Sequence, residues 1–133
     1  MLNLQTAPGR SLKVLVADDD ALNLRIAARL LKEQGCSGAL VNNGERALQL
    51  IKEQVFDLML LDISMPQMDG RETLGLLRQS ERQDKRRLPV IIVSGFESSS
   101  VVDGLLAAGA DGFLLKPLAP ETLRAEIRRV IRN

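Results

Sequence analysis

Residues that could bind a metal ion or a phosphoryl group follow four short apolar segments of the chain. Carboxylates end two of these segments, a hydroxyl ends the third and an amine the fourth. In sequence order they are VLVADDD (14–20) with Asp18, Asp19 and Asp20, LMLLD (58–62) with Asp62, VIIVS (90–94) with Ser94, and GFLLK (112–116) with Lys116. Each residue alone would be an ordinary end of a strand or start of a helix. Four such strand ends in one chain instead indicate a shared binding site.

Three neighbouring carboxylates repel one another unless one is protonated or a cation lies among them. Oxygen ligands of this kind select a hard ion, and a carboxylate group with open positions suits Mg²⁺ completed by water and a phosphate. A lysine and a serine hydroxyl at the same place would complete a cradle for a phosphoryl group. The pattern therefore favours phosphoryl chemistry at a Mg²⁺ site.

The composition excludes several other functions. The 133 residues contain no His, Tyr or Trp, which removes histidine-based catalytic triads and histidine metal sites. A formal net charge of +1 with no long basic tract gives no reason to expect nucleic-acid binding. No apolar run is long enough to cross a membrane and no signal peptide is evident, so we expect a cytoplasmic domain without membrane contact. The single cysteine, Cys36, is expected in the core or at a helix end.

Strands and helices are predicted to alternate along the chain. The predicted strands are 13–17, 38–41, 57–62, 88–94 and 112–115, and the predicted helices are 20–35, 43–54, 70–80, 100–109 and 119–133. Residues 81–87 (ERQDKRR) are expected to form a charged surface loop. Strands that are apolar along their whole length indicate a parallel sheet with both faces covered, that is, an α/β doubly wound fold. In such a sheet the ligand site lies at the carboxyl ends of the strands, where the four polar ends would meet.

The segments VLVADDD, LMLLDISMPQMDG, VIIVSG and GADGFLLKPL resemble, in order and spacing, the signature blocks of the response-regulator receiver domain, the CheY-like family of two-component signalling. The resemblance runs from about residue 12 to the end. It implies a flavodoxin-like five-stranded parallel sheet of order 2-1-3-4-5 with helices on both faces. We expect residues 1–10 to be an N-terminal tail and residues 11–133 to be the receiver domain.

The resemblance also assigns roles to individual residues. It implies that Asp62 accepts a phosphoryl group from a phosphohistidine of a partner histidine kinase or phosphotransfer protein. Since this chain has no histidine, the phosphoryl group must come from another molecule. The implied Mg²⁺ ligands are Asp18, Asp19, Asp62 and the backbone carbonyl of Ser64, and the implied phosphate-binding residues are Ser94 and Lys116. The Lys116–Pro117 bond is expected to be cis.

The family's switch couples a hydroxyl residue, here Ser94, to an aromatic position that is Phe113 in this chain. Phe96, two residues beyond Ser94, would flank the path of the attacking water and slow loss of the phosphoryl group. In the helix predicted for 100–109, one face (Val101, Leu105 and Ala108) is expected to pack on the sheet. Val102 and Leu106 form a second apolar row, which we interpret as the output surface for a downstream protein or a second copy of the chain. A row of Arg124, Arg128 and Arg132 lies on the closing helix.

Other interpretations remain open at this point. The segment DDDAL (18–22) imitates the Asp-x-Asp motif of haloacid-dehalogenase-like phosphatases, with Asp18 as nucleophile and Asp20 as acid, but this leaves Asp62 without a role. The chain could also be a receiver fragment of a larger hybrid kinase, or a receiver that binds partners without phosphate. In the favoured interpretation it is not an enzyme, beyond catalysing its own phosphorylation and slow dephosphorylation.

Overall fold

The computed structural model describes residues 5–7, 10–65, 68–84, 86–95 and 98–131. The strands are β1 (Gln5–Ala7), β2 (Arg10–Ser11), β3 (Lys13–Ala17), β4 (Ser37–Val41), β5 (Leu58–Asp62), β6 (Val90–Ser94) and β7 (Gly112–Leu115). The helices are α1 (Ala21–Glu33), α2 (Gly44–Glu53), α3 (Gly70–Asp84), α4 (Ser99–Ala107) and α5 (Pro120–Ile131). Helices and strands alternate from β3 onward, as the sequence predicts.

Five strands form one parallel sheet in the order β4-β3-β5-β6-β7. Counted along the chain from β3, this is the predicted order 2-1-3-4-5, and the α/β doubly wound fold is confirmed. The central strands β5 and β6 are buried at every position, because helices cover both of their faces. Ahead of this sheet, β1 and β2 pair antiparallel. This pair includes part of the expected N-terminal tail (residues 1–10), and no sequence pattern predicted it.

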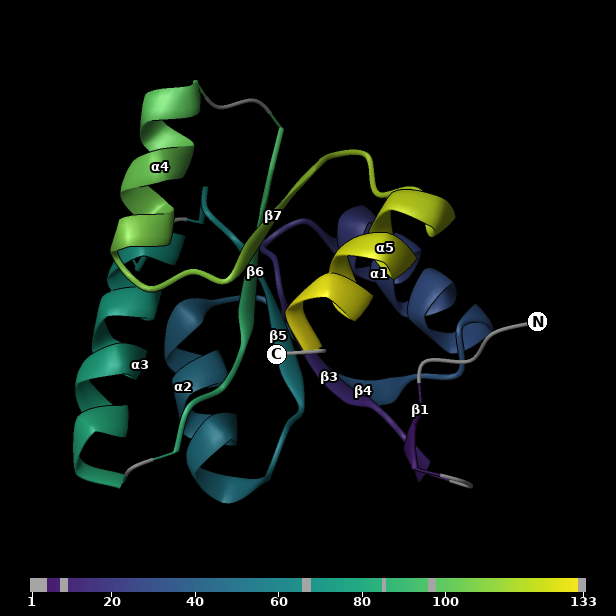
Figure 1. Ribbon diagram of the computed structural model, residues 1–133, viewed down its shortest axis with the longest axis horizontal. Helices are drawn as coiled ribbons and strands as arrows, with labels where there is room; N and C mark the ends of the chain where they lie inside the picture. Colours follow the sequence, from purple (N-terminus) through teal and green to yellow (C-terminus); the bar gives the residue numbers. More distant parts are fainter. Residues whose placement is uncertain (1–4, 8–9, 66–67, 85, 96–97, 132–133) are drawn as a thin grey trace.

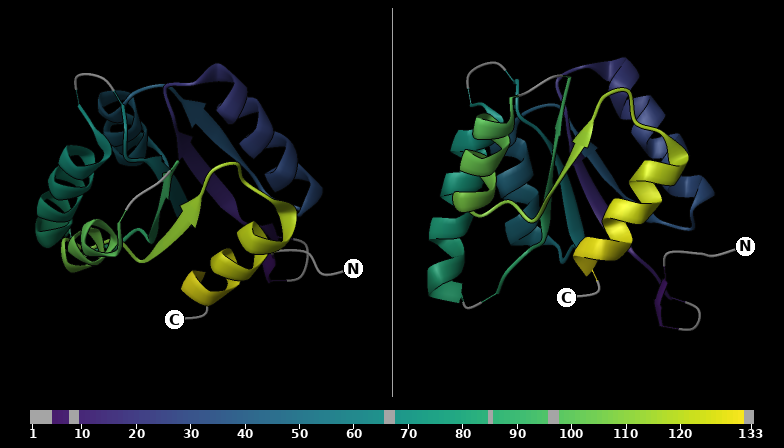
Figure 2. Two further views of the ribbon diagram at one scale, coloured as in Figure 1. Left: turned by 90° about the horizontal axis from the view of Figure 1, so that it is seen from above. Right: turned by 45° about the horizontal axis from the view of Figure 1, so that its top comes forward.

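Helices α1 and α5 cover one face of the sheet, and α2, α3 and α4 cover the other (Figures 1 and 2). Each face has its own apolar core. Val16, Leu60 and Val93 lie in the core beneath α1 and α5, whereas Leu61 and Ile92 lie in the core beneath α2, α3 and α4. Cys36 is buried in the first of these cores, as expected, and burial raises the pKa of its thiol to about 11. None of the helices in the described parts of the chain has both the length and the apolar content to cross a membrane.

Polar side chains set the starts of the helices. Asp20, Asn43 and Ser98 are the N-cap residues of α1, α2 and α4, and each accepts a hydrogen bond from a backbone N–H of the first turn. Asp69 does the same at α3 by accepting from the N–H of Glu72 at 2.9 Å. These caps lie at the ends of the loops that follow the carboxyl ends of the strands.

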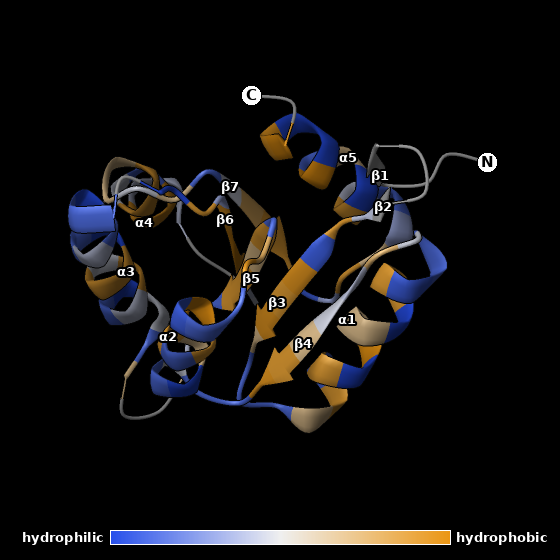
Figure 3. Ribbon diagram, turned by 90° about the horizontal axis from the view of Figure 1, so that it is seen from below, coloured by the Kyte–Doolittle hydropathy of each residue, from blue (hydrophilic) through white to orange (hydrophobic). Residues whose placement is uncertain are grey.

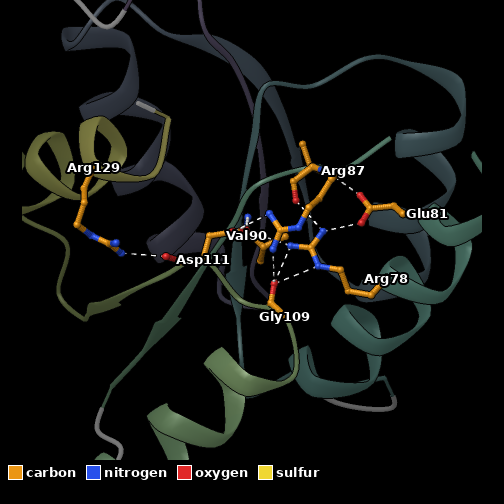
Figure 4. A network of polar contacts seen from close by, with 8 residues as sticks. Arg78, Glu81, Arg87, Val90, Gly109, Asp111 and Arg129 are labelled. Carbon is orange, nitrogen blue, oxygen red and sulfur yellow. Dashed lines mark hydrogen bonds and ion pairs between the residues drawn. The ribbon is translucent and has the colours of Figure 1, made fainter. Parts of the chain in front are cut away.

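Helix α3 continues to Asp84, so the prediction of a surface loop from residue 81 was wrong. Glu81, the first residue of this extension, has two partners, since it pairs with Arg78 and accepts from the N–H of Leu88 at 2.6 Å. Arg78 contacts Glu81 at 2.6 Å and Asp111 at 3.0 Å, and it donates to the carbonyl of Gly109 at 2.8 and 3.1 Å. Figure 4 shows this network, in which Arg87 also contacts Asp111. Asp111 accepts from the N–H of Val90 as well, so the network joins α3 to the starts of β6 and β7.

Ala108 is exposed, and the expectation that it packs on the sheet was wrong. Helix α4 ends at Ala107, Ala108 is its C-cap, and Gly109 follows with φ of 117°, which turns the chain away from the helix face. Leu105 is buried, and Val101 is half-buried against the same core, as expected. Arg124 and Arg128 are half-buried on α5. Arg132 and Phe96 lie outside the described residues.

Candidate functional site

The predicted site residues meet at the carboxyl edge of the sheet. Asp62 is the last residue of the central strand β5, and Asp18 follows directly after the neighbouring strand β3. The N–H of Asp18 donates to the carbonyl of Val41 at 3.1 Å, which continues the pairing of β3 with β4 by one residue. Both side chains are buried, with relative exposures of 5% for Asp18 and 2% for Asp62. The topology therefore brings together two carboxylates that are far apart in the sequence.

Carboxylate oxygens of Asp18, Asp19 and Asp62 all lie within 4.8 Å of one another. Asp19 is exposed, so water can reach the group from one side. Three hard oxygen donors with an open side fit Mg²⁺, which binds few carboxylates and keeps several waters. The fourth implied ligand is the carbonyl of Ser64, and Ser64 lies beside the group, since its N–H donates to Oδ1 of Asp62 at 3.2 Å.

Asp20 has a different role from its two neighbours. Its side chain accepts from the N–H of Leu22 at 2.9 Å and from the amide of Asn23 at 3.3 Å, so it caps α1. Its own N–H donates to Oδ1 of Asp18 at 2.9 Å. Asp20 thus holds the buried carboxylate of Asp18 in position. A carboxylate committed to a helix cap is a poor general acid, which argues against the phosphatase interpretation.

Lys116 contacts both buried carboxylates. Its Nζ lies 3.1 Å from Oδ2 of Asp18 and 3.3 Å from Oδ1 of Asp62. The Lys116–Pro117 bond is cis, as expected, and the N–H of Lys116 donates to the carbonyl of Ser94 at 2.8 Å, which continues the pairing of β7 with β6. The sequence predicted a lysine near Asp62, but the contact with Asp18 could not be derived from it, because that contact depends on the direction of the lysine side chain.

Burial and neighbouring charges shift two pKa values in this group. The pKa of Asp62 is raised from 3.8 to about 6, mainly because burial disfavours its charged form, with a smaller contribution from the negative charge of Asp18. The N–H of Ser64 and the ammonium of Lys116 act in the opposite direction. Burial lowers the pKa of Lys116, but its hydrogen bond to Asp18 and the charge of Asp62 outweigh burial, so the pKa is raised. Lys116 is therefore a permanent cation in this site.

Glycines and Ser94 shape the space around Asp62. Gly70 begins α3 so close to Asp62 that a Cβ there would lie 2.6 Å from the Asp62 carbonyl oxygen. Ser94 is buried at the end of β6, one position beyond the residue that pairs with Asp62. Gly95 follows with open space beside it, since a Cβ at this position would meet no atom within 4 Å. The site is thus walled on the side of α3 and open beside Gly95.

Besides Ser94 on β6, the residues predicted to form the switch and output surface lie on α4 and β7. Phe113 is half-buried, and its ring packs against the core beneath α4. Leu106 is 42% exposed, whereas Val102 is only half-buried. Leu115 on β7 is 55% exposed. Sequence reasoning missed Leu115, although strand alternation places it on the same side of the sheet as Phe113.

Known proteins with similar sequences include a transcriptional regulatory protein and a sensor histidine kinase. The family model for the response regulator receiver domain matches residues 14–128. The transcriptional regulatory protein ZraR of Escherichia coli is 35% identical over 121 residues, which cover 91% of this chain and 26% of that protein. The sensor histidine kinase GacS of Pseudomonas protegens is also 35% identical over 121 residues, covering 90% of this chain and 13% of the kinase. The chain thus spans about a quarter or less of these two relatives.

Solved structures give the same result. The receiver domain of the histidine kinase CKI1 from Arabidopsis thaliana, complexed with Mg²⁺ and BeF₃⁻, matches with a TM-score of 0.83 and 31% identity, covering 92% of this chain and 91% of that one. The chemotaxis protein CheY4 of Vibrio cholerae matches with a TM-score of 0.82 and 28% identity, covering 90% and 98%. The family model, the relatives and the shared fold together show that this chain belongs to the response regulator receiver domain family.

Proposed function

We propose that Asp62 is the phosphoacceptor and that its phosphoryl group comes from a phosphohistidine on a partner histidine kinase or phosphotransfer protein. The observation that carries this proposal is the position of the Asp62 carboxylate. It is buried at the end of the central strand, 3.3 Å from Lys116 and grouped with Asp18 and Asp19. No other carboxylate of the group combines burial with contact to both the lysine and the amide of Ser64.

In the proposed step, a carboxylate oxygen of Asp62 attacks phosphorus as the P–N bond to the donor imidazole breaks. The imidazole leaves with the electron pair of that bond and takes a proton from water. Asp62 must be ionised to attack, and the ammonium of Lys116 and a bound Mg²⁺ would both favour its ionised form. Lys116 neutralises the transferred phosphoryl oxygens, and the open space beside Gly95 admits the donor.

Asp18, Asp19, Asp62 and the carbonyl of Ser64 would hold Mg²⁺. When bound, the ion supplies positive charge beside the phosphoryl oxygens, which phosphoryl transfer requires in addition to alignment. The protein's own part is to fix Asp18 through the N–H of Asp20 and to fix Asp62 through the N–H of Ser64. This fixed geometry supports catalysis by the domain of its own phosphorylation.

Incubation with Mg²⁺ and acetyl phosphate, followed by intact mass spectrometry, tests the assignment. Wild type should gain one phosphate, and Asp62→Asn should gain none. The matched variant Asp103→Asn removes one carboxylate from the exposed surface of α4 and should gain one phosphate like wild type. Labelling that persists in Asp62→Asn but disappears in Asp18→Asn would instead identify Asp18 as the nucleophile, as in the phosphatase interpretation.

We further propose that Ser94 and Phe113 transmit the phosphorylated state. A phosphoryl group on Asp62 offers an acceptor to the hydroxyl of Ser94, which would move toward it. That movement frees space near the half-buried Phe113, whose ring can turn inward. The surface of α4 and β7, with Val102 and Leu106, then changes shape and binds a downstream protein or a second copy of the chain. Phe113 has no hydroxyl, so this switch works through burial alone.

A further inference from the structure

The two edge strands of the sheet differ in how their outer backbone groups are used. At the β7 edge, the N–H of Phe113 donates to Oε2 of Glu126 at 2.9 Å, and the carbonyl of Asp111 accepts from Arg129 at 2.9 Å. Side chains of α5 therefore occupy that edge. At the other edge, β4 pairs only with β3 among the described residues. Figure 3 shows β4 as the outermost strand beside β3.

Backbone hydrogen bonds identify which groups of β4 face outward. The N–H of Ser37 donates to Leu12 at 2.9 Å, and the carbonyl of Val41 accepts from Asp18 at 3.1 Å. In a strand, both groups of one residue point to the same side and successive residues alternate. The groups of residues 37, 39 and 41 therefore point toward β3. Gly38 and Leu40 present two N–H and two C=O groups at the outer edge.

Two of the devices that protect exposed edges are missing from this strand, because its five residues, SGALV, include no charged residue and no proline. Leu40 is 44% exposed. Beside it, between β4 and α1, lies a groove of about 410 Å³ whose apolar lining includes Val14, Val16, Leu31, Cys36 and Leu40. Gly38 lies in the same groove, and only glycine fits there, because a Cβ would overlap the carbonyl oxygen of Val14.

We propose that β4 pairs antiparallel with β4 of a second copy of this chain, about a two-fold axis at Ala39. In this register Gly38 lies opposite Leu40 of the other copy, and each such pair exchanges two hydrogen bonds. The outer N–H and C=O groups of Gly38 and Leu40 in both copies are then all hydrogen-bonded. The pairing joins the two sheets into one of ten parallel and antiparallel strands, with an isologous interface.

The side chains complement each other in this register. Residues paired across strands point to the same face, so Leu40 of one copy lies over the bare position of Gly38 in the other and fills the groove beside α1. Because β4 carries no charged residue, no like charges are opposed between the two strands. A contact of five residues per strand is small, so we expect a weak dimer. It does not involve Asp62, and it therefore forms without phosphorylation and is independent of the function proposed above.

Disulfide trapping tests the register. Opposed Ala39 Cα atoms would be about 4.5 Å apart, within the range that a disulfide spans. Ser37 lies on the same face of β4, but its opposite residue is Val41, and two copies of Ser37 would be about 13 Å apart. Under mild oxidation, Ala39→Cys should form disulfide dimers at least about tenfold faster than Ser37→Cys. Equal rates for the two variants, or no dimer of Ala39→Cys, would overturn the proposal.

Sedimentation velocity at protein concentrations between about 1 µM and about 1 mM tests the β4 pairing without introduced cysteines. Wild type and Asp62→Asn should both shift from monomer toward dimer as concentration rises. Leu40→Lys should remain monomeric, because a charge at the outer edge blocks pairing. Leu76→Lys, on α3 with a similar exposure of 41%, should behave like wild type. Acetyl phosphate labelling checks that Leu40→Lys is folded. A monomeric wild type at the highest concentration, or a dimeric Leu40→Lys, would show that β4 does not pair in this way.

Discussion

The ammonium of Lys116 lies 3.3 Å from Oδ1 of Asp62, at the ends of two different strands. Even so, the pKa of Asp62 is raised to about 6, because burial of the carboxylate and the charge of Asp18 outweigh this contact. One lysine shared between two buried carboxylates does not neutralise both of them. The site should therefore bind a further cation or a proton, and the free energy of unfolding should depend on this binding.

Asp62→Asn should stabilise the protein when divalent ions are absent. The pKa of Asp62 in the folded protein is about 6, above the ordinary value of 3.8, so the folded state binds the proton more tightly than the unfolded state. The free energy of unfolding should therefore fall as pH rises through this interval and stay low above it. At neutral pH the asparagine variant should gain on the order of 2 kcal/mol.

Urea denaturation in EDTA at several pH values measures this effect. The difference between Asp62→Asn and wild type should be small near pH 4 and full near pH 7. Asp103→Asn is the control for loss of one carboxylate and should show no such pH-dependent gain. If the asparagine variant is less stable than wild type at neutral pH, the carboxylate of Asp62 is not held under strain in the folded protein.

Asp19→Asn should weaken Mg²⁺ binding while leaving the metal-free protein nearly unchanged in stability. Asp19 contributes one of three grouped carboxylates, and its loss should reduce affinity at least about tenfold. Its side chain is exposed, so the change in the free energy of unfolding in EDTA should stay within about 0.5 kcal/mol. Calorimetric titration with Mg²⁺ measures the first effect and urea denaturation the second. Undiminished affinity would remove Asp19 from the ligand set.

Much of the site could be predicted from the sequence because the fold is a parallel sheet. Asp18, Asp62, Ser94 and Lys116 each follow an apolar strand, and the carboxyl ends of parallel strands lie on one edge. The starts of the helices at Asp20 and Asn43 could also be predicted, since capping depends on residues two or three positions apart. These features rest on local patterns and on one topological rule.

Features that depend on distant side chains could not be predicted. The contact of Lys116 with Asp18 depends on the direction of a long side chain, and the link between α3 and the start of β7 depends on Arg78 reaching Asp111 from another part of the chain. The end of α4 before Ala108 follows from the turn at Gly109. The exposed edge of β4 could not be predicted either. A sequence does not show which strand edges will be occupied by the side chains of a helix.

Arg78→Met should destabilise the protein strongly. The Arg78 side chain is only 13% exposed and contacts Glu81, Asp111 and the carbonyl of Gly109, so its removal takes a charged donor from each of these acceptors and leaves two carboxylates less compensated. We expect a loss of roughly 3 kcal/mol in the free energy of unfolding. Arg29→Met, at an ion pair whose arginine is 82% exposed, should change it by less than about 1 kcal/mol.

Thermal and urea denaturation of the two methionine variants measure this difference. The double variant Arg78→Met/Asp111→Asn should lose less than the sum of the two single variants, because both changes remove the same contact. Additive losses would mean that Arg78 and Asp111 stabilise the protein through separate partners. In that case the network would not act as a single link between α3 and the starts of β6 and β7.

Leu106→Asp should separate phosphorylation from output. Leu106 is 42% exposed on α4, away from the carboxylate group, so the variant should gain one phosphate as wild type does. A charge in the proposed output surface would prevent burial of that surface, so phosphate-dependent binding of a partner or a second copy should be lost. Leu76→Asp on α3, at 41% exposure, is the matched control and should retain it. Val102 is half-buried, so a charge there would also disturb packing, and Leu106 is the sharper test.

Sedimentation velocity with and without acetyl phosphate measures phosphate-dependent self-association. All proteins in this experiment carry Leu40→Lys, so that pairing through β4 does not contribute. An increase in dimer on phosphorylation should appear in the Leu40→Lys protein and in its Leu76→Asp derivative, but not in its Leu106→Asp derivative. If phosphorylation causes no self-association, the same three proteins can be compared for binding to the partner kinase's downstream target. Equal phosphate-dependent binding by Leu106→Asp and Leu76→Asp would show that the output surface is not on α4, and that Phe113 does not transmit the phosphorylated state to this helix.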